Sequence, residues 1–451
     1  MSERGTIARH AGTVLVGQLA TMAFGVADTL IAGRYAPEAL ATLSVGSAVY
    51  ISIFVALQAM VQAQLPVWAE LRGRRRGPEV GRSVRQAVWL CGAGMVVGMG
   101  ALLFPDPLLR WAEVPPHLEQ QVLDYLAVLA LSLPAALLFR AYSTLNQALG
   151  RPVMVTWLQA ASLVVKVPLS IWLTFGGLGV PAMGLAGCAW ATVIVNWLLV
   201  ALAGWALRTH SLYAPYRIWR AIERPDWKTL RAFARLGVPT ALAVMVEVTS
   251  FTLMALFIAR QGTVAAASHQ IASNLTAVLY MVPLSLGLAC SARVSYWLGA
   301  GDDRRAREAL RTGLRITLLL ACISAAILVL GRHGLARLYA GDNPQVVQGA
   351  AGLLLWVALY HVADAMQALC VFLLRSFGVA TRPLVVYCVL LWGVGLGGGY
   401  LLAYRGLGPW PPLHTPAAFW GAGGVALALT AAVFTALLWR VVRSHRPAAA
   451  A

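Results

Sequence analysis

The sequence predicts an all-α integral membrane protein, with twelve transmembrane helices in two pseudo-symmetric six-helix bundles around a central cavity. Three observations predict this fold. Of the 451 residues, 59% are hydrophobic and 12% are charged, whereas soluble domains are about 25% charged. The apolar residues occur in runs of the length, about 20 residues, that a helix needs to cross the hydrocarbon layer. The runs before the longest polar interval resemble those after it, so an internal repeat is expected.

Twelve apolar runs are expected to span the membrane. The first has no small-residue cleavage site behind it, so we expect a membrane helix there and not a cleaved signal peptide. The approximate limits of the spans are 11–33, 41–69, 86–104, 121–149, 153–175, 183–207, 233–259, 265–298, 313–331, 347–375, 383–404 and 418–441.

The distribution of basic residues predicts the orientation. With both termini in the cytoplasm, 26 of the 35 Lys and Arg residues fall in the tails and the cytoplasmic connections, and 6 fall in the outer connections. The positive-inside rule describes this asymmetry for a multi-pass membrane protein. The net charge of +18 is therefore a topology signal. It also suits contact with anionic membrane lipids, and nucleic acid is not expected as a partner.

The longest polar interval divides the chain into two halves of six spans each. We expect one bundle over 1–207, a cytoplasmic linker over 208–230 and a second bundle over 231–451. Related segments lie at matching places: LFRAYSTLNQALGRP and CVFLLRSFGVATRP each end a helix and open the next span with Arg-Pro. A proline at a helix start costs no hydrogen bond. An even number of spans per half makes the repeats parallel, an arrangement found in secondary transporters.

Three acidic residues, Asp28, Glu247 and Asp364, lie inside apolar spans and away from their ends. Glu247 is 12 residues after Arg235 and 13 before Arg260, which places it about 18–20 Å from either flanking charge and near the bilayer midplane. A charge at that depth costs at least about 2.5–3.5 kcal/mol. Each acid is therefore either neutral or paired and fixes packing, or it takes part in function.

Glu247 and Asp364 together favour a cation site, because two carboxylates in a low-dielectric interior repel. Asp364 lies 11 residues before Arg375, about 16 Å along the helix from the expected membrane boundary. Oxygen ligands suit a proton or a hard monovalent cation such as Na+, and the sequence has no thiolate or imidazole cluster for a transition metal.

Catalytic motifs are absent from the sequence. It contains no phosphate-binding loop, H-E-x-x-H or G-x-S-x-G motif. The glycine-rich run at 393–399 has no strand before it, so it predicts helix packing and not dinucleotide binding. We therefore expect no enzyme and no cofactor other than H+ or Na+ as a coupling ion.

Lys166 and two histidines are the other polar residues of interest in the spans. Lys166 is the only lysine inside a span, and it is expected either to pair with Asp28 or to extend towards the membrane surface from a helix end. His361 precedes Asp364 by three residues and shares its helix face. It either tunes the acid or only packs. His269 opens the eighth span and is expected to hydrogen-bond locally.

The chain resembles the multidrug and toxic compound extrusion (MATE) family, in its NorM-like branch, along nearly its whole length. The matching segments are VADTLIAGRYAPEALATLSVGSAVY, FGGLGVPAMGLAGCAWATVIVNW, RLGVPTALAVMVEVTSFTLMALFIARQGTVAAASHQIASN, VPLSLGLACSARVSYWLGAG and ADAMQALCVFLLRSFGVATRP. Their order and spacing make the resemblance specific. One departure lies at 166–170, which reads Lys-Val-Pro-Leu-Ser where the family often has Asn-Ile-Pro-Leu-Asn. A lysine there would hold Asp28 ionised and occupied, which argues against a direct proton-carrier role for Asp28.

The resemblance implies a cation-coupled antiporter that exports amphipathic, often cationic drugs or toxins by alternating access, in exchange for H+ or Na+. It implies that Glu247 and Asp364 bind the coupling cation and are the metal ligands if that cation is Na+. A monomer is expected. The residues expected in the substrate cavity are Asp28, Lys166, Ser170, His361, Gln270 and Asn274.

Two other functions stay open from the sequence. A flippase for a lipid-linked precursor, of related architecture, would favour a strongly cationic cavity for pyrophosphate. The spans instead hold three acids against Lys166, Arg140 and Arg293. A membrane-embedded enzyme would need a catalytic motif, and none of those named above occurs.

Overall fold

The structure, a computed structural model, describes residues 3–105, 116–177, 179–220, 222–341, 343–406, 408 and 411–444. Within these residues, twelve helical segments are long and apolar enough to cross a membrane, which confirms the predicted all-α fold with twelve transmembrane helices. The helices are longer than the apolar runs. The ninth extends over Asp303–Ala340, against a predicted 313–331, because its polar end residues continue the helix beyond the length that the hydrocarbon layer requires.

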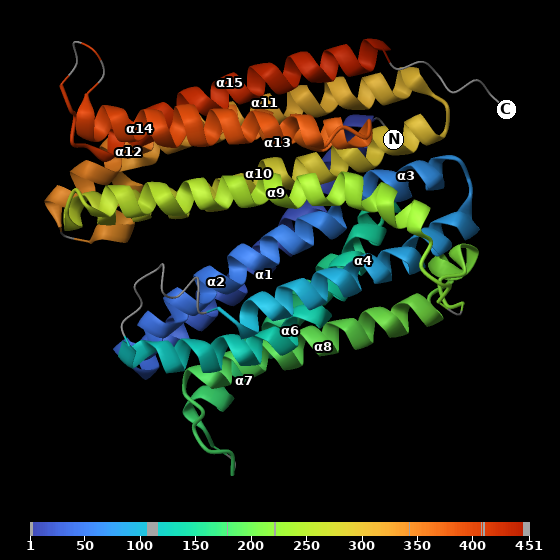
Figure 1. The fold of residues 1–451 in the computed structure, drawn as a ribbon, viewed down its shortest axis with the longest axis horizontal. Helices are drawn as coiled ribbons and strands as arrows, with labels where there is room; N and C mark the ends of the chain where they lie inside the picture. The colour runs from blue at the N-terminus through green and yellow to red at the C-terminus, as the bar shows by residue number, and fades with distance from the viewer. Residues whose placement is uncertain are drawn as a thin grey trace. The chain divides into compact units, whose positions relative to one another are not determined.

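The chain folds into two compact units, one formed by residues 13–241 and the other by residues 1–12 and 242–451. The helices of both are shown in Figure 1. Two helices, α1 (Glu3–Tyr35) and α9 (Trp227–Ala259), contribute residues to both units. The predicted division into bundles over 1–207 and 231–451, with a linker over 208–230, stays a prediction.

The unit of residues 13–241 is built around its fourth span. Besides parts of α1 and α9, it contains α2 (Pro37–Gln62), α3 (Leu65–Gly73), α4 (Gly77–Leu103), α6 (Pro116–Ala148), α7 (Val153–Phe175), α8 (Leu185–Thr209) and the short 3-10 helix η1 (Ser211–Tyr216). Helix α6 packs against α2, α4 and α8. Of its most apolar stretch 61% is buried, against 22% for α1, so α6 is the central helix. The second span is divided between α2 and α3, where Pro66 opens the second piece.

The unit of residues 1–12 and 242–451 is built around its tenth span. It contains α10 (Thr263–Gly299), α11 (Asp303–Ala340), α12 (Pro344–Ser376), α13 (Thr381–Tyr387), the π-helix η2 (Cys388–Gly397), α14 (Gly398–Tyr400), the π-helix η3 (Leu401–Arg405) and α15 (Pro416–Ser444). Helix α12 packs against α10, α11 and α15. Of its most apolar stretch 78% is buried, against 17% for α9. Polar side chains on the buried part of α12 are therefore shielded from lipid.

The glycine-rich run in the eleventh span packs against α15. A Cβ atom added at Gly399 would lie 2.7 Å from a ring carbon of Phe419, and one added at Gly395 would lie 3.3 Å from the Ala426 Cβ. This confirms helix packing as the role of the run. Much of the eleventh span is π-helical, a conformation that usually occurs only as a single turn.

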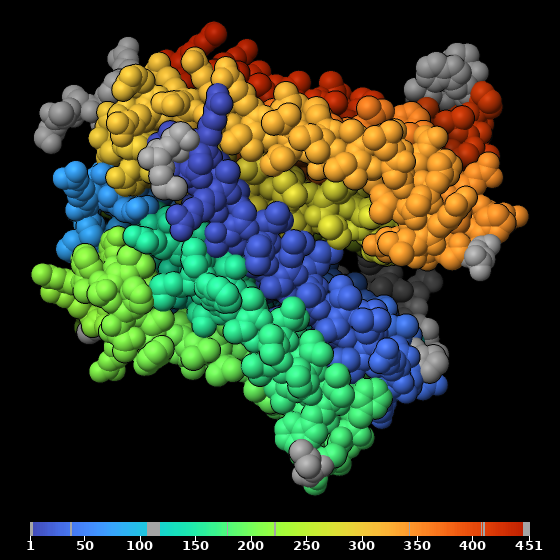
Figure 2. All heavy atoms as spheres, turned by 180° about the vertical axis from the view of Figure 1, so that it is seen from behind, coloured from blue at the N-terminus to red at the C-terminus, as the bar shows by residue number. Residues whose placement is uncertain are grey.

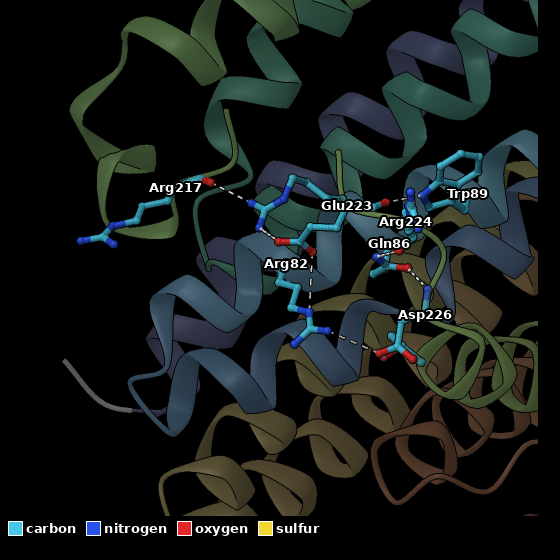
Figure 3. Close-up of polar contacts among 9 residues, drawn as sticks. Arg82, Gln86, Trp89, Arg217, Glu223, Arg224 and Asp226 are labelled. Carbon is cyan, nitrogen blue, oxygen red and sulfur yellow. Dashed lines mark hydrogen bonds and ion pairs between the residues drawn. The ribbon is translucent and has the colours of Figure 1, made fainter. Parts of the chain in front are cut away.

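The polar segment after α8 is held against α4, as Figure 3 shows. Arg85 donates from Nη2 to Glu223 Oε1 at 2.7 Å and from Nη1 to the Arg217 carbonyl at 2.8 Å. One residue on, Gln86 Oε1 accepts from the Asp226 amide at 2.9 Å. The hydrogen bond from Arg85 holds the pKa of the Glu223 carboxyl below its usual value. These hydrogen bonds join the described residues after α8 to α4 within one unit.

Candidate functional site

Asp28 and Lys166 form a buried ion pair in the unit of residues 13–241. Lys166 Nζ donates to Asp28 Oδ2 at 2.8 Å and to Oδ1 at 2.9 Å, and to Thr192 Oγ1 at 2.7 Å. Ser170 Oγ donates to Asp28 Oδ1 at 3.4 Å. The Lys166 side chain is 0% exposed. Of the two roles predicted for Lys166, the structure shows pairing with Asp28.

A polar stripe along α7 explains how this pair forms. Gln159, Ser162, Lys166 and Ser170 are buried and recur every three or four residues, so they lie on one face of the helix. Gln159 Nε2 donates to Thr21 Oγ1 on α1 at 3.0 Å. The stripe therefore faces α1, which also carries the carboxylate that Lys166 binds.

The Asp28–Lys166 pair is electrically neutral, and its ammonium group has no unused hydrogen-bond donor. A lysine ammonium has three N–H donors, and the contacts of Lys166 to Asp28 and Thr192 use all three. Removing one partner of a buried ion pair costs about 3–5 kcal/mol. A proton or Na+ at Asp28 would therefore compete with the ammonium that already neutralises this carboxylate.

Glu247 and Asp364 lie close enough to interact electrostatically, in the unit that includes residues 242–451. Glu247 comes from α9 and Asp364 from α12. Asp364 is 3% exposed, and its Oδ1 accepts a hydrogen bond from Gln367 Nε2 at 2.9 Å. Tyr387 on α13 donates in turn to Gln367 Oε1. The structure thus brings together the two carboxylates singled out in the sequence, and it adds a hydrogen-bond chain from α13.

Arg375 belongs to the same cluster, although its place at a helix end predicts a position at the membrane boundary. The structure buries Arg375, and its guanidinium interacts electrostatically with Glu247. The sequence contains a signal for this, because Arg375 follows Asp364 by about three helical turns and so shares its face of α12. The tyrosines Tyr280 and Tyr360 also lie within electrostatic reach of both carboxylates.

The two histidines have different surroundings. His361 is 1% exposed, and its Nδ1 has no hydrogen-bond partner among the described residues. The hydrogen bond to Asp364 Oδ1 comes from Gln367, one turn after the acid. A tuning role for His361 therefore stays a prediction. His269 Nε2 lies 3.2 Å from Ser273 Oγ, one turn further along α10, which confirms the expected local hydrogen bond.

Gln270 and Asn274 lie on an exposed face of α10. Gln270 Nε2 donates to Asn274 Oδ1 at 3.2 Å. Within the described part of the chain, no hydrogen bond joins either amide to Glu247 or Asp364. Their predicted place in the substrate cavity stays a prediction, as does that of Ser170.

The described residues contain no group of three or more His, Cys, Asp or Glu side chains that could hold a metal ion. A transition-metal site at Glu247 and Asp364 is not supported by this donor set. A Na+ ion there would need further oxygen ligands, such as a tyrosine hydroxyl or a backbone carbonyl. A proton needs only one carboxylate oxygen.

Comparison with known proteins finds relatives along nearly the whole chain. The MatE family model matches residues 14–172 and again residues 239–401. "Probable multidrug resistance protein NorM" of Aromatoleum aromaticum is 37% identical over 439 residues, which cover 97% of this chain and 94% of that protein. Multidrug resistance protein PmpM of Pseudomonas aeruginosa is 34% identical over 444 residues, which cover 97% of this chain and 90% of that protein.

The fold is similar to that of solved transporters. The crystal structure of the eukaryotic MATE transporter AtDTX14 superposes with a TM-score of 0.85 at 19% identity, covering 98% of this chain and 97% of that chain. Such low identity supports the fold alone. The family model matches twice, as expected for a chain with an internal repeat, and the sequence relatives cover almost all of it. The chain is therefore a membrane transporter, not an enzyme, and it belongs to the MATE family in its NorM-like branch.

Proposed function

We propose that this transporter exports amphipathic, often cationic compounds across the bacterial inner membrane in exchange for entering H+ or Na+. The observation that carries the proposal is the cluster of Glu247, Asp364 and Arg375, in which Asp364 and Arg375 are buried and Glu247 is half-buried. The names of the relatives, multidrug resistance proteins, support the substrate class. In this proposal the protein acts as a monomer, and both termini lie in the cytoplasm.

The charge of the cluster favours one cation per cycle. With both carboxylates ionised, Glu247, Asp364 and the guanidinium that interacts with Glu247 would together carry one negative charge in excess. One H+ or one Na+ makes the cluster neutral, and a second would leave it positive in a low-dielectric interior, which is costly. The cluster is therefore suited to a single monovalent cation.

The hydrogen-bond chain offers a way to couple cation binding to helix movement. Gln367 donates to Asp364, and Tyr387 donates to Gln367, so the chain joins α12 to α13. Neutralising Asp364 weakens the charge-assisted hydrogen bond from Gln367. A cation can drive transport only if it binds one of the two access states better than the other. We assign that difference to the rearrangement of α12 against α13, with drug released outwards when the cation enters.

Asp28 and Lys166 have a different role in this proposal. Because their charges cancel, we assign cation coupling to the cluster of Glu247, Asp364 and Arg375 and not to this pair. Asp28 and Lys166 instead line the substrate path, together with Ser170. His361, Gln270 and Asn274 are the corresponding candidates on α12 and α10.

The intramembrane cations do not support the flippase alternative. Lys166 is neutralised by Asp28, and Arg293 pairs with Glu3 at 2.6 Å. Of the three cations that the sequence places in the spans, Arg140 is then the one with no ion pair among the described residues. A pyrophosphate group would need more positive charge than this.

Dye efflux from proteoliposomes, with Na+ and pH gradients imposed separately, tests the proposal. The wild-type protein should respond to one of the two gradients. The double variant Glu247→Gln, Asp364→Asn should lose gradient-driven efflux while reaching the membrane at normal levels. Glu38→Gln removes an exposed carboxylate at the start of α2 and serves as the matched control with normal efflux. Normal efflux from the double variant, or a wild type that ignores both gradients, would contradict the proposal.

A further inference from the structure

A cavity of about 600 Å³ is lined by the first turns of α11 and by the start of α1, and most of its polar side chains are arginines. Figure 2 shows the dark blue start of α1 beside the gold residues of α11, within the same unit. The basic side chains of the lining are Arg4, Arg304, Arg307, Arg311 and Arg315. This cavity lies at the end of a transmembrane helix, and it contains none of the residues placed in the cation cluster.

The cavity carries excess positive charge. Its acidic lining residues are Glu3, Asp303 and Glu308. Glu3 is already neutralised, because Arg293 binds both of its carboxylate oxygens, at 2.6 and 2.8 Å. Five arginines therefore face two remaining acids. Among the described residues, no hydrogen bond or ion pair engages the guanidinium groups of Arg304, Arg307 or Arg315, so they are free to bind an anion.

The same face of α11 becomes apolar within one turn of the last arginine. Arg304, Arg307, Arg311 and Arg315 are spaced three or four residues apart, and Leu318 and Cys322 continue the spacing. Leu318 is 45% exposed and its neighbour Leu319 is 61% exposed. One helix face thus presents exposed cations followed by exposed hydrocarbon.

We propose that this face of α11 binds an anionic phospholipid, with its phosphate on the arginines and its acyl chains along Leu318, Leu319 and Cys322. Charge complementarity supports an anionic headgroup, and clusters of arginines at the end of a membrane helix attract such lipids. The apolar continuation distinguishes a lipid from a soluble phosphate, which would have no use for it. The positive-inside distribution of basic residues puts this end of α11 in the cytoplasmic leaflet. The lipid is a partner of the transporter and not its cargo.

Native mass spectrometry of the full-length protein in detergent tests this, by titration with dioleoyl phosphatidylglycerol, with dioleoyl phosphatidylethanolamine and with inorganic phosphate as competitor. Phosphatidylglycerol should bind more tightly than phosphatidylethanolamine. Arg307→Gln with Arg315→Gln should weaken the binding of phosphatidylglycerol by about tenfold or more and leave that of phosphatidylethanolamine unchanged. The matched control is Arg332→Gln with Arg337→Gln, which removes two arginines near the other end of the same helix, and it should bind phosphatidylglycerol normally.

Two further measurements test the proposal even if the Arg307→Gln, Arg315→Gln variant fails to fold. Leu318→Gln, at an exposed position, should also weaken phosphatidylglycerol binding, and so should high salt with the wild-type protein. Equal affinity for the two lipids would overturn the proposal, as would normal phosphatidylglycerol binding by the Arg307→Gln, Arg315→Gln variant. Displacement of the lipid by an equal concentration of inorganic phosphate would show a site for a soluble anion instead.

Discussion

The two units both bury carboxylates within transmembrane helices, but they provide different partners for them. In the unit of residues 13–241, Asp28 has its own ammonium, Lys166 Nζ, at 2.8 Å. In the other unit, Glu247 interacts electrostatically with Asp364 and with the guanidinium of Arg375. Asp28 is thus paired one to one with a cation, whereas the second cluster has two carboxylates and one guanidinium. Our proposal assigns coupling to Glu247 and Asp364 on the basis of this difference, because a carboxylate that already has its own ammonium is less available to another cation.

Breaking the Asp28–Lys166 pair should have the largest effect on stability. Lys166→Met leaves Asp28 as a buried carboxylate whose remaining hydrogen-bond partners, Ser170 and Cys188, are neutral. We expect a loss of about 3–5 kcal/mol, measured by thermal unfolding in detergent. Adding Asp28→Asn removes the unpaired charge and should restore most of the stability. A Lys166→Met protein as stable as the wild type would show that Asp28 does not depend on this ion pair.

Removing the guanidinium from the cluster of Glu247, Asp364 and Arg375 should change the number of coupling cations that are bound in each transport cycle. Arg375→Gln leaves Glu247 and Asp364 with two negative charges and no guanidinium. We expect the efflux rate to depend on roughly the second power of the cation concentration, instead of roughly the first, because both carboxylates must now be neutralised. Initial rates of dye efflux across a series of Na+ or H+ concentrations measure this. Arg382→Gln, at an exposed position at the start of α13, should leave the order unchanged. If the efflux rate of Arg375→Gln kept the wild-type dependence on cation concentration, Arg375 would not belong to the cation site.

Cutting the hydrogen-bond chain should have a smaller effect. Tyr387→Phe removes the donor to Gln367 Oε1, which fixes the amide that bonds Asp364. A hydrogen bond of this kind contributes about 0.5–1.5 kcal/mol, so the apparent cation affinity should fall by roughly twofold to tenfold. Tyr404→Phe also removes a tyrosine hydroxyl, one that donates to the Phe257 carbonyl, and it should keep the wild-type affinity. Equal affinities in the two variants would show that the chain does not support the cation site.

The ion pair of the exposed Glu223 carboxyl with the buried Arg85 guanidinium gives the reference for the intramembrane sites. Glu223 is 40% exposed on its side chain, and the hydrogen bond from Arg85 lowers its pKa below the usual value of 4.5. A carboxyl with a lowered pKa stabilises the fold above its unfolded pKa, and this contribution is lost as the pH falls through the folded pKa. Glu223→Gln should therefore cost at most about 1 kcal/mol at neutral pH. The difference from wild type should disappear in acid.

Thermal unfolding of the wild type and Glu223→Gln across a pH series checks this last prediction. The two curves should converge as the pH falls below 4.5, the usual pKa of this carboxyl. If their difference grew in acid instead, the sign of the pKa shift would be wrong.

Local composition determined the membrane architecture and the choice of carboxylates. Whether a run of residues can cross a bilayer depends on its own length and polarity, so the twelve spans were predictable without knowing which helices touch. Asp28, Glu247 and Asp364 stand out for the same reason, because a charged residue in an apolar run is visible in the run itself.

Only the tertiary structure decided how those charges are satisfied. The sequence permits Lys166 either to pair or to reach the surface, and the packing of α7 against α1 selects the pair with Asp28. The sequence also singles out His361, one turn before Asp364, as a residue that either tunes the acid or only packs, and in the structure the hydrogen bond to Asp364 comes from Gln367, one turn after it. The burial of Arg375 depends likewise on helices far away in the sequence. Helical periodicity specifies which residues share a face, but the neighbour that covers that face is set by the packing of the whole bundle.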